Sequence, residues 1–256
     1  MDVRKIVGVS VLSLGMGLGT VAGLGACASG PDGGDDDSPG AACTALTGIP
    51  AGDDPTVIDD LEDGDEGIAE NGSRVGSWYS FNDGTAGGTQ TPAEADDFKP
   101  SGVDGACGMF AARTQGKGFK DWGAGIGLDL NAPVPANPTD PEIKKAYDAS
   151  AYTGIAFEAK GNVGITVGVA EIATVPMADG GSCTPSTVEG MECEDNHSKA
   201  IALNSDWKTY KIAFADLKQE GFGAPAAFDA KTITGIQFSV AQNLEFDFSI
   251  DNVRFY

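Results

Sequence analysis

The sequence predicts an all-β fold, a sandwich or jelly roll with long loops. Nearly every periodic segment has a period of two, which is the spacing of side chains on one face of a β-strand. Turns rich in glycine separate these segments, and the chain contains 37 glycines. Helix signals are few: one lies around residues 142–148, in PEIKKAYD, and a short turn is expected after Phe214.

The first residues predict an export signal. Arg4 and Lys5 precede an apolar run at residues 6–25 that is too rich in glycine for a convincing membrane span. The sequence LGAC, which ends at Cys27, resembles the lipobox of bacterial lipoproteins. This resemblance implies a signal peptide over residues 1–26, cleavage before Cys27 and a diacylglyceryl group on its sulfur. The alternative is an ordinary signal peptide that is cleaved near Ala28.

Residues 27–55 predict a flexible acidic tether. They include SGPDGGDDDSPG and AGDDP and have almost no large apolar side chains, so they cannot bury enough surface to fold. Residues 56–256 are enough for one sandwich domain with its own core. We therefore expect an exported protein, attached to the cell envelope at the outer membrane or the cell surface. It would touch the membrane only through its lipid anchor.

The charge of the chain restricts its partners. The formal net charge is -22, from 16 basic and 38 acidic residues. Nucleic acids and anionic lipid headgroups are therefore poor partners, whereas cations and neutral ligands are better ones. We expect a monomer that binds no nucleic acid.

Four cysteines remain if Cys27 carries lipid, and export permits disulfides. Cys183 and Cys193 flank the polar loop TPSTVEGME, so we expect them to pair. Cys43 and Cys107 would then pair by elimination and join the tether to the domain.

Nine segments are expected to form strands, and an additional opening strand is considered below. They are residues 78–82, 109–116, 126–130, 155–159, 165–169, 197–203, 210–214, 236–240 and 246–255. Long loops are expected at residues 131–150 and 173–196.

In the last strand, Phe246, Phe248 and Ile250 alternate, but the next apolar residues have the opposite parity. This slip predicts a β-bulge at Asp251 and Asn252.

Three segments, in this order, resemble the jelly-roll carbohydrate-binding modules with a galactose-binding-like fold. They are VIDDLEDGD at 57–65, DWKTYKIAFADL at 206–217 and FDFSIDNVRFY at 246–256. The resemblance extends from Val57 to Tyr256 in outline, without the two long loops. It implies non-catalytic recognition of a polysaccharide or other glycan. It also implies a structural calcium ion where the first and last strands meet.

The residues suited to that ion are Glu62 or Asp63 at one end of the domain and Asp251 at the other. Calcium takes six to eight oxygen ligands, and a bulge exposes carbonyl groups that a regular ladder would use. The alternative is that Asp251 and Asn252 form only a polar kink on an edge strand.

Glycan binding requires aromatic rings for the apolar sugar faces and polar side chains for the hydroxyl groups. The candidate rings and their candidate polar partners are Trp78, Tyr79 and Trp122, with Asp121, Arg113 and Gln237. Trp78 and Tyr79 point to opposite faces of one strand, so one of them is expected in the core.

Catalysis has little support. His197 is the only histidine, expected to be solvated in a loop, and no GxSxG, HExxH or P-loop spacing occurs. We therefore expect a protein that is not an enzyme. A polysaccharide hydrolase or lyase stays an alternative, because a glycosidase needs only two carboxylates. A structural or adhesion lipoprotein that binds another envelope protein is the other alternative.

Overall fold

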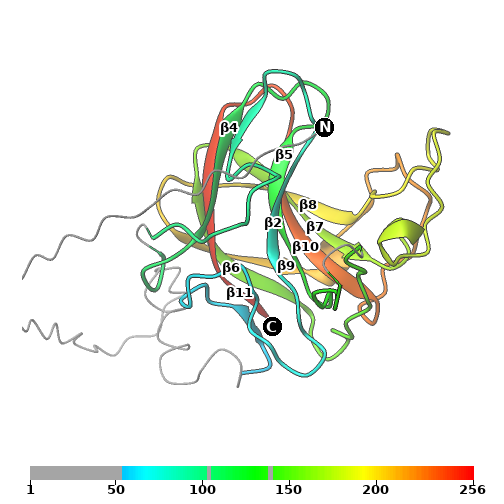
Figure 1. The fold of residues 1–256 in the computed structure, drawn as a ribbon, viewed down its shortest axis with the longest axis horizontal. Helices are drawn as coiled ribbons and strands as arrows, with labels where there is room; N and C mark the ends of the chain where they lie inside the picture. Colours follow the sequence, from blue (N-terminus) through cyan, green and yellow to red (C-terminus); the bar gives the residue numbers. More distant parts are fainter. Residues whose placement is uncertain (1–53, 103–104, 138–140) are drawn as a thin grey trace, which may run out of the picture. The chain divides into compact units, whose positions relative to one another are not determined.

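The computed structural model describes residues 54–102, 105–137 and 141–256. These residues form eleven strands in two antiparallel sheets, which confirms the all-β jelly-roll sandwich (Figure 1). Within the same residues, no helix has the length and apolar character needed to span a membrane. The expected signal peptide and nearly all of the tether lie outside the described residues, as do Cys27 and Cys43.

The first sheet has the strand order β3-β4-β11-β6-β9, and β1 pairs with β11 as well. Its strands are β1 (Val57–Asp59), β3 (Thr89–Thr91), β4 (Ala112–Lys117), β6 (Gly154–Gly161), β9 (Lys208–Ala213) and β11 (Phe246–Phe255). The first and last strands of the described chain therefore lie side by side.

The second sheet has the strand order β2-β5-β10-β7-β8. Its strands are β2 (Trp78–Asn82), β5 (Ala124–Asp129), β7 (Gly164–Glu171), β8 (His197–Ala202) and β10 (Ile233–Val240). In Figure 1, β11 (red) and β4 mark the first sheet, and β10 (orange), β7 and β8 mark the second. Two short 3₁₀ helices, η2 (Met177–Asp179) and η3 (Phe214–Asp216), lie in connections, and η3 matches the turn expected after Phe214.

The core lies between the two sheets and is built from the alternating apolar residues. Ile126 and Leu128 of β5 and Phe238 of β10 are fully buried, as is Phe157 of β6 in the first sheet. The rings of Phe157 and Phe238 meet edge to face, with centroids 5.1 Å apart, so they join the sheets directly.

The bulge in the last strand is confirmed. The register between β11 and β6 shifts between Asp251 and Arg254, and Asn252 has a φ of 49°. Ile250 and Val253 can therefore both face the core, although they are three residues apart. Asp251 and Asn252, the polar residues at the kink, are buried as well.

The helix expected around residues 142–148 is wrong. These residues are extended, because their backbone N–H groups have partners in distant segments. The N–H of Lys144 donates to the carbonyl of Asp179 (2.9 Å), and that of Tyr147 donates to the carbonyl of Ile233 (2.7 Å). Tertiary hydrogen bonds thus replace the intrahelical bonds that the local sequence favours.

The expectation that His197 is solvated is also wrong. His197 is the first residue of β8 and is only 6% exposed. Its Nδ1 lies 2.6 Å from Oε2 of the buried Glu171, at the end of β7. β3 was missing from the sequence prediction, because the polar segment TQT has no apolar alternation and is a strand only through pairing with β4.

Candidate functional site

The outer face of the second sheet, which points away from the core, carries two rows of side chains that cross the strands. Strand pairing places Tyr79 beside Gly127, Gly127 beside Gln237, and Gln237 beside Gly168. The adjacent row follows the same pairing: Phe81, Gly125, Ser239 and Thr166. Each row therefore has one aromatic ring at the β2 edge, followed by small and polar residues.

The glycines of β5 let these rings lie across the sheet. A Cβ at Gly127 would come within 2.8 Å of the Tyr79 ring, and one at Gly125 within 2.6 Å of the Phe81 ring. Any larger residue at either position would push the ring away from the strand. Gly125 and Gly127, two residues apart on β5, thus allow the two rings to lie flat against the sheet.

Trp122 extends this surface beyond the N-terminal end of β5. Its ring is 51% exposed and stacks on Phe81, with centroids 6.0 Å apart and an angle of 27° between the planes. The Oδ2 atom of Asp83 accepts hydrogen bonds from the backbone N–H groups of Asp121, Trp122 and Gly123. Asp121 is exposed beside Trp122, so both candidates from the sequence lie at this rim.

The hydrogen bonds at Asp83 also affect its own ionisation. Burial is the largest single influence and raises the pKa of Asp83, but the hydrogen bonds from Thr85 and from the backbone of Asp121 and Gly123 together outweigh it and hold the pKa below its usual range. The carboxylate that positions Trp122 is therefore charged at neutral pH.

A chain of hydrogen bonds connects the outer face to the loop between β7 and β8 (residues 172–196). The hydroxyl of Thr174 donates to Oδ1 of Asn196 (2.6 Å), and Nδ2 of Asn196 donates to Oε1 of Gln237 (3.0 Å). Nε2 of Gln237 in turn donates to the hydroxyl of Tyr79 (3.3 Å). Gln237 lies on the face, as expected, with its amide oriented by neighbours on both sides.

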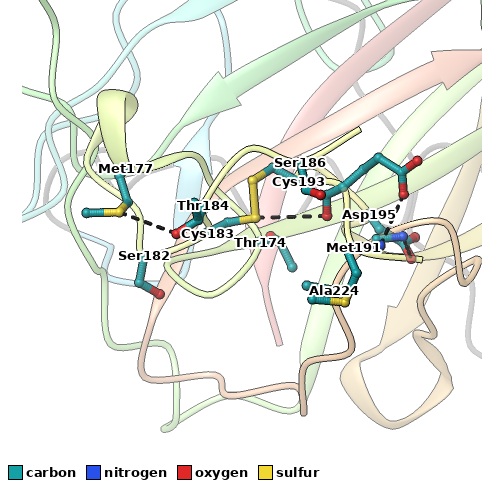
Figure 2. Close-up of a disulfide and its surroundings, with 12 residues drawn as sticks. Thr174, Met177, Ser182, Cys183, Thr184, Ser186, Met191, Cys193, Asp195 and Ala224 are labelled. Atoms are coloured by element: carbon teal, nitrogen blue, oxygen red, sulfur yellow. Dashed lines mark hydrogen bonds between the residues drawn. A yellow bond between two sulfur atoms is a disulfide. The ribbon is translucent and has the colours of Figure 1, made fainter. Parts of the chain in front are cut away.

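The same loop contains the expected disulfide between Cys183 and Cys193, with an S–S distance of 2.04 Å. Figure 2 shows this disulfide with Thr174 and Asp195 of the loop beside it. Cys107 is disulfide-bonded as well. Its expected partner, Cys43, lies outside the described residues.

A cavity of about 200 Å³ lies where β2 and β5 meet the segment after residue 140. Its lining consists of Ser77, Trp78, Tyr79, Asp129, Glu142 and Lys144. Nζ of Lys144 lies 2.9 Å from Oδ1 of Asp129 and 4.9 Å from the centre of the Tyr79 ring. The ammonium group therefore covers a ring that the sequence suggested for sugar stacking.

The ionisable groups of the cavity depend on one another. Burial raises the pKa of Asp129 and also that of Glu142, although Lys144 partly offsets both effects. Burial would lower the pKa of Lys144, but the nearby Tyr79 and Asp129 outweigh it and hold the pKa above its usual value. Lys144 is thus charged at neutral pH.

Two of the residues expected at the glycan site lie elsewhere. Trp78 is in the core, 2% exposed, because its strand parity matches the inward residues and its Nε1 donates to Oδ2 of Asp59 (2.6 Å). Arg113 lies on β4 in the first sheet, where its Nε donates to Oδ1 of Asp247 (2.8 Å). Neither side chain reaches the outer face of the second sheet.

The sequence interpretation missed several residues of this face. Phe81 and Asp129 could have been found from the alternation of each strand, because Phe81 is two positions after Tyr79 on β2 and Asp129 is two positions after Gly127 on β5. Asp83, Asn196 and Lys144 could not, because their roles depend on segments that are distant in sequence.

The residues expected at a calcium site converge only in part. Oε1 of Glu62 accepts from the N–H groups of Met109 and Phe110, and Oδ2 of Asp251 accepts from the N–H of Ala106 (2.6 Å). Both carboxylates thus contact the segment of residues 105–110. Asp63 is exposed and bonds only within its own turn, to the N–H of Asp65.

Asp251 has the character of a residue that a cation would stabilise. It is 1% exposed, and none of the ion pairs in the described part of the chain includes it. Burial raises its pKa to about 7, although N–H groups of Ala106 and Asn252 partly offset this. Among the described residues, however, no three acidic, histidine or cysteine side chains form a metal-binding group. Backbone carbonyls and water would have to complete a site at Glu62 and Asp251.

Comparison with known proteins gives distant relatives. No family model matches the chain. Over 196 residues the chain is 27% identical to Endoglucanase 3 of Fibrobacter succinogenes, a match that covers 73% of this chain and 24% of that enzyme. The matched region thus spans about a quarter of the curated relative.

Two similar solved structures are carbohydrate-binding modules, as the resemblance in the sequence implied. One is a family 11 module from Clostridium thermocellum in complex with a β-1,3-1,4-mixed-linked tetrasaccharide. It has 20% identity and a TM-score of 0.46, and the match covers 78% of this chain and 94% of the module. The other is a family 30 module of a cellulosomal cellulase from the same organism, with 15% identity, a TM-score of 0.44 and coverage of 75% and 96%.

Proposed function

We propose that this protein binds a neutral glycan on the outer face of the second sheet and does not cleave it. The observation that carries the proposal is the exposed ring of Trp122, stacked on Phe81 and positioned by three backbone hydrogen bonds to Asp83. A rigid, exposed ring provides the surface on which the apolar face of a sugar stacks. Because the ring is already positioned, little conformational entropy is lost on binding.

The rest of the face supplies what a stacked sugar needs. Gln237 and Ser239 provide polar groups for hydroxyls, and the glycines of β5 let the rings of Tyr79 and Phe81 lie low over the sheet. The net charge of -22 favours neutral over anionic polysaccharides. The names of the similar proteins suggest β-glucans as the first ligands to test.

We propose binding rather than hydrolysis because of the ion pair in the cavity. Asp129 and Glu142 both line the cavity beside Tyr79, and Nζ of Lys144 lies 2.9 Å from Oδ1 of Asp129. With Asp129 engaged by an ammonium group, the cavity does not offer the two free carboxylates that glycoside hydrolysis uses. Incubation with β-glucan should therefore release no reducing ends, and Glu142-dependent release would instead establish a hydrolase.

The binding experiment compares two tryptophan variants by calorimetry. Trp122→Ala should weaken binding of a β-1,3-1,4-mixed-linked tetrasaccharide by about tenfold or more. Trp207→Ala is the matched control and should bind the glycan normally. Trp207 lies beside the first sheet, where the centre of its ring is 4.7 Å from Nζ of Lys160. Equal losses in the two variants, or no binding of any glycan on an array, would exclude this site and favour a protein partner.

We further propose that the domain is carried by an exported lipoprotein, anchored through Cys27 at the outer membrane or cell surface, and that it is monomeric. The support is the basic and apolar leader that ends in LGAC. Cys27→Ser should release the protein from the membrane fraction. Retention in that fraction would show another mode of attachment.

A further inference from the structure

We infer that the cavity beside Tyr79 is a subsite for one uncharged sugar ring and that it discriminates against rings that carry a negative charge. This inference rests on the proposed function and concerns its specificity. The cavity lies next to the outer face, because Tyr79 belongs to both the first row of that face and the cavity lining.

The size of the cavity suits a small unit of a glycan. Its volume of about 200 Å³ is below the 300 to 1,000 Å³ typical of sites for drug-sized ligands. Stacking on Tyr79 is prevented, because the Gly127 strand lies under the ring and Lys144 lies over it. A ligand would instead meet the polar groups at the cavity wall.

Those polar groups match the hydroxyls of a sugar. A hydroxyl both donates and accepts hydrogen bonds, and the cavity offers carboxylate acceptors on Asp129 and Glu142 and an ammonium donor on Lys144. Asp129 is 6% exposed and is charge-compensated by Lys144, so a neutral group can approach it without leaving a buried charge unpaired.

The balance of charge gives the discrimination. The charges of Asp129 and Lys144 cancel, and Glu142 leaves the cavity with one negative charge. Two further carboxylates add negative charge close to the cavity. Asp179 raises the pKa of Asp129, and Glu66 raises the pKa of Glu142. A sugar carboxylate placed here would face Glu142 with no free cation to pair with in the cavity lining.

The cavity wall is held in place by the backbone. The N–H of Lys144 donates to the carbonyl of Asp179 (2.9 Å), and the N–H of Lys145 donates to that of Asn131 (2.7 Å). The segment that carries Glu142 and Lys144 thus joins the two long loops at the end of the sheet. Neither loop maps onto the resemblance found in the sequence, so this specificity would belong to this chain.

The test compares two ligands by calorimetry: the β-1,3-1,4-mixed-linked tetrasaccharide and the same compound with its primary hydroxyls oxidised to carboxylates. The unmodified protein should bind the oxidised compound at least about tenfold more weakly. Glu142→Gln should reduce this difference to about threefold, whereas Glu94→Gln, an exposed carboxylate outside the cavity, should leave it unchanged. The difference should persist at 1 M salt, where the Debye length is about 3 Å and the net charge of the protein is screened.

A second pair of variants tests the donor. Lys144→Gln should weaken binding of the neutral tetrasaccharide by about tenfold, and the neighbouring Lys145→Gln should not. Equal binding of both ligands, or a difference that Glu142→Gln does not reduce, would overturn the inference. Trp122-dependent binding would then still support the proposed function, whereas a protein that binds neither ligand contradicts both.

Discussion

The backbone N–H of Trp122 donates a hydrogen bond of 3.1 Å to Oδ2 of Asp83, a residue 39 positions earlier in the chain. The same oxygen accepts from the residues on either side of Trp122. One carboxylate at the end of β2 therefore holds the whole turn that presents the most exposed ring of the outer face.

This contact predicts that Asp83 controls binding without touching the ligand. Asp83→Ala should weaken glycan binding by about three- to tenfold. Without the carboxylate the Trp122 turn becomes mobile, and ordering it when the glycan binds uses part of the binding free energy. The tryptophan fluorescence anisotropy should fall as the ring gains mobility. Asp148→Ala is the matched control, since Asp148 accepts a turn N–H from Ser150 elsewhere, and normal affinity in both variants would contradict the prediction.

The buried Asp59 predicts how stability depends on pH. Burial raises the pKa of Asp59 to about 7, despite hydrogen bonds from Leu61 and Trp78. Because the folded state binds this proton more tightly than the unfolded state, the stabilisation is present below about pH 4 and is lost as the pH rises through 7. The free energy of unfolding in urea should therefore be lower at pH 8 than at pH 5.

Trp78→Phe tests the same pair. It removes the donor to Asp59 and should cost about 1 to 3 kcal/mol at pH 8, where the carboxylate is charged. The loss should be smaller at pH 5, because hydrogen bonds to a neutral acid are weaker. Equal losses at the two pH values would show that Asp59 does not titrate in this range.

The pair of Glu171 and His197 predicts a strong dependence of stability on one side chain. Glu171 is fully buried, and burial raises its pKa, while His197 at 2.6 Å partly offsets this. His197→Ala should cost about 3 kcal/mol or more in denaturant unfolding, because it removes the imidazole from Oε2 of a buried carboxylate, which then keeps only the N–H of Asp229 at Oε1.

A double-mutant cycle identifies the cause of that loss. Adding Glu171→Gln to His197→Ala should recover part of the stability, since the amide carries no charge. Additive losses would instead indicate that His197 contributes through packing on Phe228, whose ring centroid is 5.4 Å away.

The calcium hypothesis predicts an increase in melting temperature when calcium is added to protein treated with a chelator. Asp251→Asn should abolish the increase, because Asp251 is a buried carboxylate of the last strand, which pairs with the first strand, and it contacts the same segment as Glu62. Asp63→Asn is the control and should respond as the unmodified protein does, since Asp63 is exposed and bonds within its own turn. An unmodified protein that does not respond would show that the N–H groups of residues 105–110 satisfy Glu62 and Asp251 without an ion.

Features that depend on neighbours in sequence could be predicted. The alternation of apolar residues predicted the strands of the core, and the change of parity after Ile250 predicted the bulge. Cys183 and Cys193, ten positions apart, could be paired for the same reason. The rim position of Trp122 was expected from the preceding turn, which is rich in glycine and lysine, but the distant Asp83 holds that turn in place.

The sequence by itself therefore determined the strands of the core, their inward faces and the short-range disulfide. Only the tertiary structure decided which side chains meet: Arg113 with Asp247 in the first sheet, and Lys144 with Asp129 at the cavity. The physical reason is that side-chain alternation is a property of one strand, whereas these contacts depend on which strands pair and in which register. The segment at Lys144 demonstrates this, because long-range backbone hydrogen bonds replaced the helix that its local sequence favours.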